Sequence, residues 1–263
     1  MTIRSAAIVI SPSRAEAISA AKDLAPLLYS AGFSLYTTSD VSLEGIKKVS
    51  PDDLPEIEIA VVLGGDGTIL RAAEITLKRN IPLLGINMGH VGFMAEVERP
   101  SIAAIAESII SKSYVSEDRM TLRFSIEREG KEIGNGWALN EVTVERDGTT
   151  MVELFVEIDN RPLSHWGCDG LICSTPTGST AYAFSAGGPV VWPEVDALVL
   201  LPISAHALFS RPMVVSPKSE IVVTIDSSDA LLSADALRKI ELHKGDRVPV
   251  SYTHLTLPTN REV

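Results

Sequence analysis

One carboxylate among glycines stands where an apolar run gives way to helix-forming residues. The run 60–63 is followed by Gly64-Gly65-Asp66-Gly67-Thr68 and then by a helix-rich stretch. Glycines permit close approaches that side chains forbid, and the free N–H groups at the start of a helix attract anions. The pattern is typical of a turn that binds a phosphate or a ribose. The alternative is a plain connection in which Asp66 caps the helix.

A second glycine-rich turn, residues 87–93, follows the next apolar run and contains His90 and Phe93. His90 is interpreted either as a general base or as a hydrogen-bonding loop residue, and Phe93 either as a ring that stacks on a base or as a core anchor. Neither Gly-x-x-x-x-Gly-Lys-Ser/Thr nor Gly-x-Gly-x-x-Gly directly after a strand occurs, which disfavours a standard P-loop enzyme.

Two stretches of the second half also carry polar chemistry. In the strand pattern 138–142, Asn140 and Glu141 stand side by side, and adjacent strand residues face opposite sides, so one of them is expected to point into a cleft. An exposed sheet edge is the alternative. Residues 167–188 crowd glycines and hydroxyl side chains around Tyr182, which favours a nucleotide-binding surface over a Gly/Ser-rich connection.

The elements that must position these residues differ between the two halves. Apolar runs at 5–10, 33–36, 59–63 and 82–86 predict buried strands, 15–31 predicts a helix that ends at Gly32, and 41–58 predicts a loop or weak helix. Continuous apolar strands alternating with helices indicate a mostly parallel sheet with helices on both faces. Ligands collect at the carboxyl ends of such strands, where both glycine-rich turns lie.

After a predicted helix at 102–110, the sequence alternates apolar and polar residues. The pattern predicts strands at 122–127, 137–145, 152–158, 161–166 and 171–174, with hairpin turns at Glu129-Gly130 and Asp159-Asn160. The second half is therefore expected to be β-rich. We place the domains at 1–112 and 113–250.

The composition bounds the class of protein. A chain of 263 residues with 45% apolar content is long enough for two packed domains, and a net charge of -11 disfavours nucleic-acid and anionic-membrane partners. Cys168 and Cys173 are expected to be free thiols in a reducing compartment. No secretory segment or run of membrane-spanning length is apparent, so we expect a cytoplasmic protein.

Taken together, the motifs resemble those of the NAD kinase family. The turn 64–68, the turn 87–93, Asn140-Glu141, Asp169-Gly170 and the stretch 175–182 occur in that family's order and approximate spacing, over roughly residues 5–250. The first motif is shared with diacylglycerol-type lipid kinases and phosphofructokinases. The stretch Thr-Pro-Thr-Gly-Ser-Thr-Ala-Tyr at 175–182 is far more specific.

The resemblance implies a Rossmann-like α/β domain, a sandwich-like β-rich domain and NAD bound in the cleft between them. ATP, with a divalent metal expected to be Mg²⁺, would donate its γ-phosphoryl group to the 2′-hydroxyl of the adenosine ribose, giving NADP. The motifs do not indicate metal ligands. The resemblance also implies a homodimer or homotetramer.

The family motifs assign a role to each matching residue. Asp66 would be the base that accepts the hydroxyl proton, and Arg71 would meet phosphate unless it is merely a solvated helix residue. Gly67 and Asn140 would line the adenosine end, and Glu141 would contact sugar hydroxyls. The rest of the dinucleotide site would comprise Phe93, Asp169, Thr180, Ala181, Tyr182 and Ser185.

The sequence departs from the family pattern in two places. Where the family has Asp-Gly, this chain has Asp235-Ala236, and a turn that needs positive φ would be strained at Ala236 by about 1 kcal/mol. Residues 251–263 do not resemble the family's continuation and are expected to form an anomalous tail. Two alternatives remain: a lipid or sugar kinase that shares the glycine turn, and a catalytically weak NAD-binding module.

Overall fold

The computed structural model describes residues 4–87, 97–98, 101–207, 210–227 and 229–261, with the backbone alone for 87, 97–98 and 254–261. Contacts group the chain into two units, Met1–Arg119 with Thr256–Val263, and Met120–Leu255. The domain limits expected from the sequence, at 112 and 250, stay a prediction. We describe each unit by itself.

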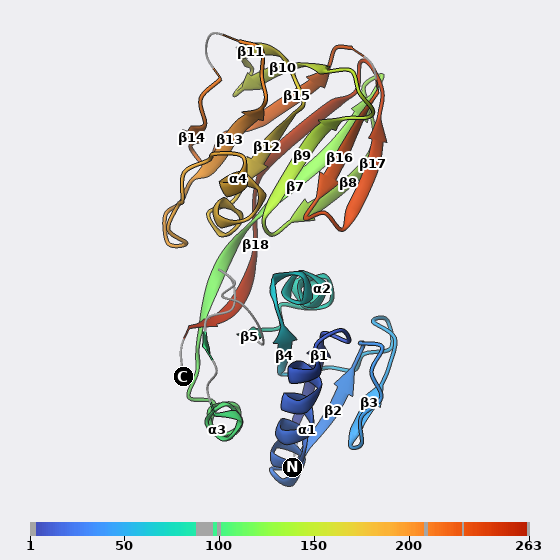
Figure 1. Ribbon diagram of the computed structural model, residues 1–263, viewed down its shortest axis with the longest axis vertical. Helices are drawn as coiled ribbons and strands as arrows, with labels where there is room; N and C mark the ends of the chain where they lie inside the picture. The colour runs from blue at the N-terminus through green and yellow to red at the C-terminus, as the bar shows by residue number, and fades with distance from the viewer. Residues whose placement is uncertain (1–3, 88–96, 99–100, 208–209, 228, 262–263) are drawn as a thin grey trace. The chain divides into compact units, whose positions relative to one another are not determined.

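The first unit is built on a parallel sheet with strand order β5-β4-β1-β2-β3 (Figure 1). Thr259, near the end of β18, pairs with Leu83 of β5. The elements of this unit are β1 (Arg4–Ile10), α1 (Ala15–Ser30), β2 (Phe33–Thr37), β3 (Ile46–Lys48), β4 (Ile59–Gly64), α2 (Asp66–Thr76), the 3₁₀ turn η1 (Leu77–Arg79), β5 (Leu83–Asn87), β6 (Val97–Glu98) and α3 (Ile102–Ser111).

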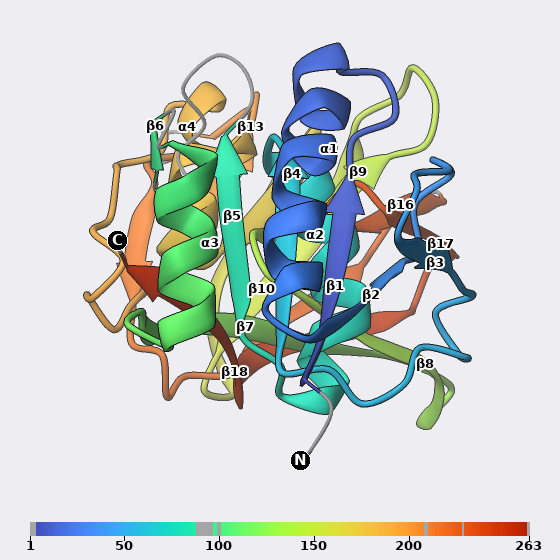
Figure 2. The same cartoon turned by 90° about the horizontal axis from the view of Figure 1, so that it is seen from below.

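Helices cover both faces of this sheet, α1 and α3 on one side and α2 on the other (Figure 2). Alternate residues of β1 point to opposite faces of the sheet. Ile8 belongs to the core with α1 and α3, whereas Ala7 packs with Leu54 and Ile57 on the face that α2 covers. Both faces are buried, so the strands need apolar residues at every position. This is why the runs are continuous in the sequence.

The second unit consists of two antiparallel sheets. One has the order β14-β13-β12-β9-β16-β17, and the other contains β11-β10-β15-β18 with β7 and β8. The elements are β7 (Val115–Arg128), β8 (Lys131–Ala138), β9 (Glu141–Arg146), β10 (Val152–Ile158), β11 (Arg161–Cys168), β12 (Gly170–Ser174), η2 (Thr177–Thr180), α4 (Tyr182–Ser185), β13 (Leu198–Ile203), β14 (Met213–Val215), β15 (Ile221–Ile225), β16 (Ala230–Ala234), β17 (Arg238–Leu242) and β18 (Arg247–Arg261).

One apolar core joins these two sheets. Phe124 and Trp166 from one sheet and Val144 and Leu200 from the other belong to the same buried cluster. Side chains from the inner faces of two sheets form the core of a β-sandwich. The predicted fold class, an α/β unit with a mostly parallel sheet followed by a β-rich, sandwich-like unit, is confirmed.

Several local expectations are also confirmed. The hairpin residues Asp159 and Asn160 have φ of 52° and 60°, and Glu129 and Gly130 have φ of 53° and 73°, the left-handed values that such two-residue turns require. Both cysteines are free and buried. The short strand β3 was missed, because only its first residue is buried.

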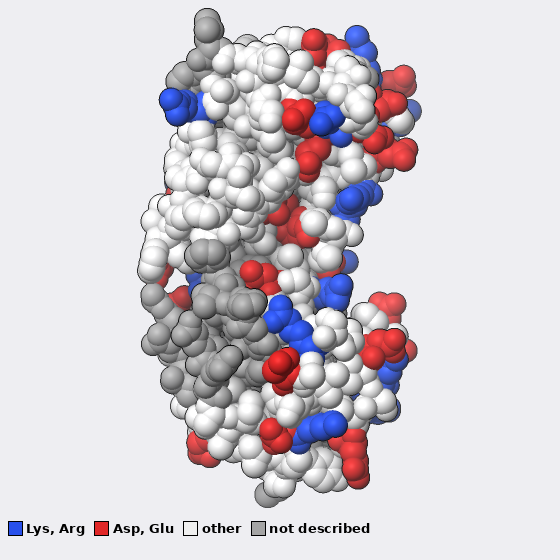
Figure 3. Space-filling view, viewed as in Figure 1, with Lys and Arg blue, Asp and Glu red and all other residues white. Residues whose placement is uncertain are grey.

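None of the described helices is long and apolar enough to cross a membrane. On the face drawn in Figure 3, the described Asp and Glu side chains are interspersed with Lys and Arg. Opposite charges therefore lie close together on this face despite the net charge of -11.

Candidate functional site

The parallel sheet of the first unit has a topological switch point between β1 and β4. From β1 the sheet extends to β2 and β3 on one side and to β4 and β5 on the other. The two strands end side by side, since the Ser11 N–H donates to the Leu63 carbonyl at 2.9 Å. Ligands of open α/β sheets bind at the carboxyl ends of strands at such a point.

The Gly-Gly-Asp-Gly turn lies at this point. Gly65 is the N-cap of α2 and Asp66 its first residue, so the alternative in which Asp66 caps the helix is wrong. A side chain at Gly64 would collide with Thr68. The free N–H groups of the first turn of α2 give this end of the helix a partial positive charge beside the Asp66 carboxylate.

Two basic residues accompany the turn. Arg71 is an exposed residue of α2, one helical turn beyond Gly67. Arg14, which the sequence reasoning missed, lies so that its guanidinium would be 3.4 Å from a Cβ placed on Gly65. Arg14 follows β1, and the glycine turn follows β4. The two lie close together because β1 and β4 are neighbours in the sheet, which the sequence alone does not show.

In the second unit, Asn140 lies in a break between two strands, and Glu141 is the first residue of the strand that follows the break. β8 ends at Ala138 and β9 begins at Glu141 in the other sheet. The expected continuous strand over 137–145 is therefore wrong. The reason is that Leu139, Asn140 and Glu141 donate their N–H groups to the Asp235 carboxylate, at 2.8, 2.7 and 3.3 Å.

Both side chains at the break are buried, so the exposed sheet edge is wrong as well. Asn140 is 4% exposed and Glu141 7%. Asn140 Oδ1 and Glu141 Oε2 are buried atoms with no hydrogen-bond partner among the described residues. Buried polar atoms of this kind need an explanation, and a bound polar ligand is one.

The stretch 174–181 packs against this break. The Thr175 N–H donates to the Asn140 carbonyl at 2.9 Å, and its hydroxyl donates to the Leu139 carbonyl at 2.6 Å. Gly178 lies so close that a Cβ there would run into the Asn140 backbone. Residue 178 must therefore be glycine for the two segments to approach this closely, and the Thr175 hydroxyl helps to hold them together.

Glu141 has a strongly shifted acidity. Burial, together with the negative charges of Asp235 and Glu145, raises its pKa to about 8, although the Tyr182 N–H opposes the shift. Near neutral pH the group is therefore largely protonated and can donate a hydrogen bond, for example to a hydroxyl. Shifts of this kind cluster at functional sites.

The other predicted residues of this unit lie on the segments around it. Asp169, between β11 and β12, pairs with Arg146 at 2.7 Å. The Tyr182 hydroxyl lies 3.3 Å from Glu145 Oε2. Thr180 and Ser185 donate to carbonyls of their own turns, those of Thr177 and Tyr182, and Ala181 joins the two turns.

Phe93 lies outside the described residues, as does His90. Asp235 and Arg146 contact predicted site residues, but the sequence did not single them out. The Asp235-Ala236 dipeptide was noticed only as a departure from the family pattern, and Arg146 carries no motif that separates it from any strand arginine.

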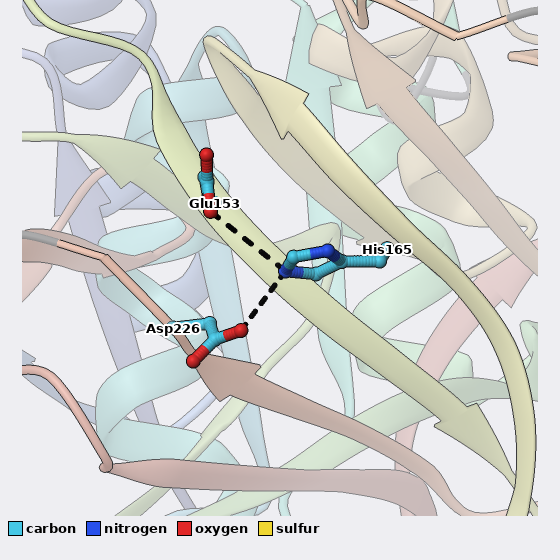
Figure 4. A group of neighbouring side chains, drawn as sticks. All are labelled: Glu153, His165 and Asp226. Atoms are coloured by element: carbon cyan, nitrogen blue, oxygen red, sulfur yellow. Dashed lines mark ion pairs between the residues drawn. The ribbon is translucent and has the colours of Figure 1, made fainter.

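A group of possible metal ligands lies apart from these residues, on the sheet formed by β11, β10 and β15. His165 Nε2 is 3.0 Å from Asp226 Oδ2 and 4.0 Å from Glu153 Oε2 (Figure 4). All three side chains are exposed. Mg²⁺ takes oxygen ligands, so a set that contains an imidazole does not fit it, and we assign no magnesium here.

Comparison with known proteins identifies the chain on both units. Residues 7–114 match the ATP-NAD kinase N-terminal domain, and residues 139–259 match the ATP-NAD kinase C-terminal domain. An NAD kinase of Mycobacterium tuberculosis is 41% identical over 94% of this chain and 88% of its own length. NAD kinase 2 of Streptomyces avermitilis is 47% identical over 79% of this chain and 70% of its own length.

Solved structures agree in fold. A yeast NADH kinase complexed with NADH matches with a TM-score of 0.88 at 24% identity, covering 99% of this chain and 84% of that one. An NAD kinase from Archaeoglobus fulgidus in complex with ATP matches with a TM-score of 0.75 at 26% identity, covering 97% and 92%.

These matches define the chain as a phosphotransferase. It belongs to the NAD kinase family, as the match of both family domains and the identity over nearly its whole length show.

Proposed function

We propose that this chain transfers the γ-phosphoryl group of ATP to the 2′-hydroxyl of the adenosine ribose of NAD, giving NADP and ADP. The observation that carries the proposal is the match of both family domains, 7–114 and 139–259. The second match speaks against a lipid or sugar kinase, since those share only the glycine turn with this chain.

Asp66 is the proposed general base. It stands at the carboxyl end of β4, beside the positive end of α2. Its carboxylate accepts the proton of the 2′-hydroxyl while that oxygen attacks the γ-phosphorus and the bond to the β-phosphate oxygen breaks. Arg14 and Arg71 supply positive charge near the glycine turn, which supports binding of the triphosphate.

The proposed dinucleotide site lies on the second unit. Asn140 Oδ1 and Glu141 Oε2 are the polar atoms that a nucleoside would satisfy, and Tyr182 offers a flat, partly exposed ring. Asp169, Thr180, Ala181 and Ser185 complete the set on this unit. On the first unit, a Cβ placed on Gly67 would meet no atom within 4 Å, so this glycine leaves room for a ligand beside Asp66. Phe93 stays a prediction from the family motif.

Mg²⁺ is the divalent metal we propose. It would arrive with the ATP phosphates and neutralise their charge. Action in the cytoplasm and assembly into a homodimer or homotetramer stay predictions.

The proposal is tested by incubating the purified chain with ATP, Mg²⁺ and NAD and measuring NADP with an NADP-dependent dehydrogenase. We expect wild-type protein to form NADP. Asp66→Asn should lower kcat by about 10²–10⁴-fold, the usual contribution of a general base, while NAD binding measured by calorimetry persists.

Glu74→Gln is the matched control, because it neutralises an exposed carboxylate further along the same helix. Near wild-type turnover by Asp66→Asn would refute Asp66 as the base. NAD binding without any NADP formation by the wild type would instead support the catalytically weak NAD-binding module.

A further inference from the structure

Asp235 makes an unusual set of contacts for a turn residue. It lies between β16 and β17, is 3% exposed, and accepts hydrogen bonds from three consecutive backbone N–H groups, those of Leu139, Asn140 and Glu141. Its own N–H donates to the Glu141 carbonyl at 3.1 Å. One side chain therefore fixes a segment that is about a hundred residues away in sequence.

The contacts occur where the chain changes sheets. Buried N–H groups at such a break need acceptors, and a carboxylate with two oxygens supplies them to three donors at once. Burying a carboxylate is costly, and burial raises the pKa of Asp235 while these N–H groups oppose the rise. Arg238, 3.6 Å from Asp235 Oδ2, also opposes the rise.

The opposite side of the same segment is held by different residues. The carbonyls of Leu139 and Asn140 accept hydrogen bonds from Thr175, and Ser174 Oγ also donates to the Asn140 carbonyl at 3.1 Å. The backbone is thus clamped on its N–H side by Asp235 and on its carbonyl side by the 174–175 stretch. These backbone contacts do not use Asn140 Oδ1 and Glu141 Oε2, which are therefore available to a ligand.

We propose that Asp235 is a positioning residue for the dinucleotide, which sets the backbone at the β8–β9 break so that Asn140 Oδ1 and Glu141 Oε2 face the ligand. This inference rests on the proposed function, in which those two side chains bind NAD. Asp235 itself does not touch the ligand; it acts through the backbone of this segment and through its charge on Glu141.

Asp235→Asn is the discriminating variant. Whichever way the amide is turned, its NH₂ group faces at least one backbone N–H, so the clamp loses a hydrogen bond and gains a repulsion. We expect the KM and Kd for NAD to rise about tenfold or more, since loss of a charged hydrogen bond has that effect when it reaches the ligand. The KM for ATP should change far less.

A pH profile provides a readout that a merely structural role would not move. Asp235, Glu145 and the Tyr182 N–H face Glu141, and the Asp235 charge helps to keep Glu141 protonated. Removal of that charge should shift the NAD-binding transition assigned to Glu141 to lower pH. Unchanged titration would contradict a direct influence on the site.

Asp246→Asn is the matched control. Asp246 is 1% exposed, accepts from the His243 N–H at 2.8 Å and pairs with Arg128, but it lies beyond the other end of β17 from Asp235. It should lower thermal stability without altering the KM for NAD. An equal rise of this KM in both variants would reduce Asp235 to a structural role and overturn the proposal.

The double variant Asp235→Asn with Ala236→Gly applies the same test if the single variant is only partly folded, because glycine relieves the positive φ of Ala236. Ala236→Gly alone should leave the KM for NAD unchanged. Wild-type NAD affinity in a folded Asp235→Asn protein would overturn the inference. Absence of NADP formation by the wild type would count against the proposed function instead, and the two failures are thereby distinguished.

Discussion

At the scale of a single residue, Glu141 makes the free energy of unfolding depend on pH. Its pKa is raised from the ordinary 4.5 to about 8, so the folded protein keeps a proton that the unfolded chain releases above pH 4.5. The contribution of Glu141 to the free energy of unfolding should therefore be greatest below that pH and fall as the pH rises toward about 8, by at most about 1.4 kcal/mol per pH unit. Glu141→Gln should flatten this slope.

Urea unfolding of both proteins at several values between about pH 5 and about pH 8 measures the slope, because burial raises the pKa of Glu141 into this window. An identical slope in wild type and Glu141→Gln would show that Glu141 titrates normally.

Ala236 carries backbone strain. It has φ of 55°, so the condition under which the sequence predicted strain, a turn that needs positive φ, is met. Ala236→Gly should raise the free energy of unfolding by about 1 kcal/mol, measured by urea unfolding, because glycine removes the left-handed penalty of an L side chain.

Ala103→Gly is the control, because it should lower the free energy of unfolding instead of raising it. Ala103 lies exposed in the first turn of α3, where glycine should destabilise by less than the about 1 kcal/mol that it costs in a helix interior. If both substitutions destabilised the protein, the strain at Ala236 would be refuted.

At the scale of elements, η2 can pack against the β8–β9 break because residue 178 has no side chain. A Cβ there would collide with the Asn140 backbone, whereas one at Gly134 would make an ordinary contact of 3.7 Å with Ile126. Gly178→Ala should therefore cost about 1–3 kcal/mol in stability and weaken NAD binding, as overpacking does in a close-packed interior.

Gly134→Ala, in β8, is the control and should leave NAD affinity intact. Calorimetry with NAD and urea unfolding measure both effects. Gly178→Ala with wild-type NAD affinity would show that the contact between the two segments does not shape the site.

At the scale of the whole molecule, the assembly state is open to a direct test. Phe184, Val190, Trp192 and Val195 are 48–65% exposed and lie within one short segment beginning in α4. Exposed apolar side chains that form a patch mark interaction surfaces, and the closeness of these four in the sequence supports the predicted homo-oligomer.

Trp192→Asp should shift the mass measured by light scattering after gel filtration toward that of the monomer. Tyr29→Asp, at a residue of α1 that is 66% exposed, is the control and should leave the mass unchanged. A monomeric wild type would refute the oligomer, and an unaltered oligomer in Trp192→Asp would place its interface elsewhere.

Much of the fold follows from the sequence because burial has a local signature. Continuous apolar runs mark strands covered on both faces, alternation marks sandwich strands, and turn residues mark hairpins such as Asp159-Asn160. The break at Leu139-Asn140 left no such signature, since it depends on an acceptor from a distant turn.

The sequence by itself determined the glycine turn around Asp66, the alternation of strands and helices, and the family motifs, because each depends on residues that are neighbours in the chain. Only the tertiary structure decided that Arg14 comes to the glycine turn, that Asp235 clamps the Asn140-Glu141 backbone, and that Glu141 is buried beside negative charges. Hydrogen bonds and desolvation act through space, so their partners appear only once the strands have been placed.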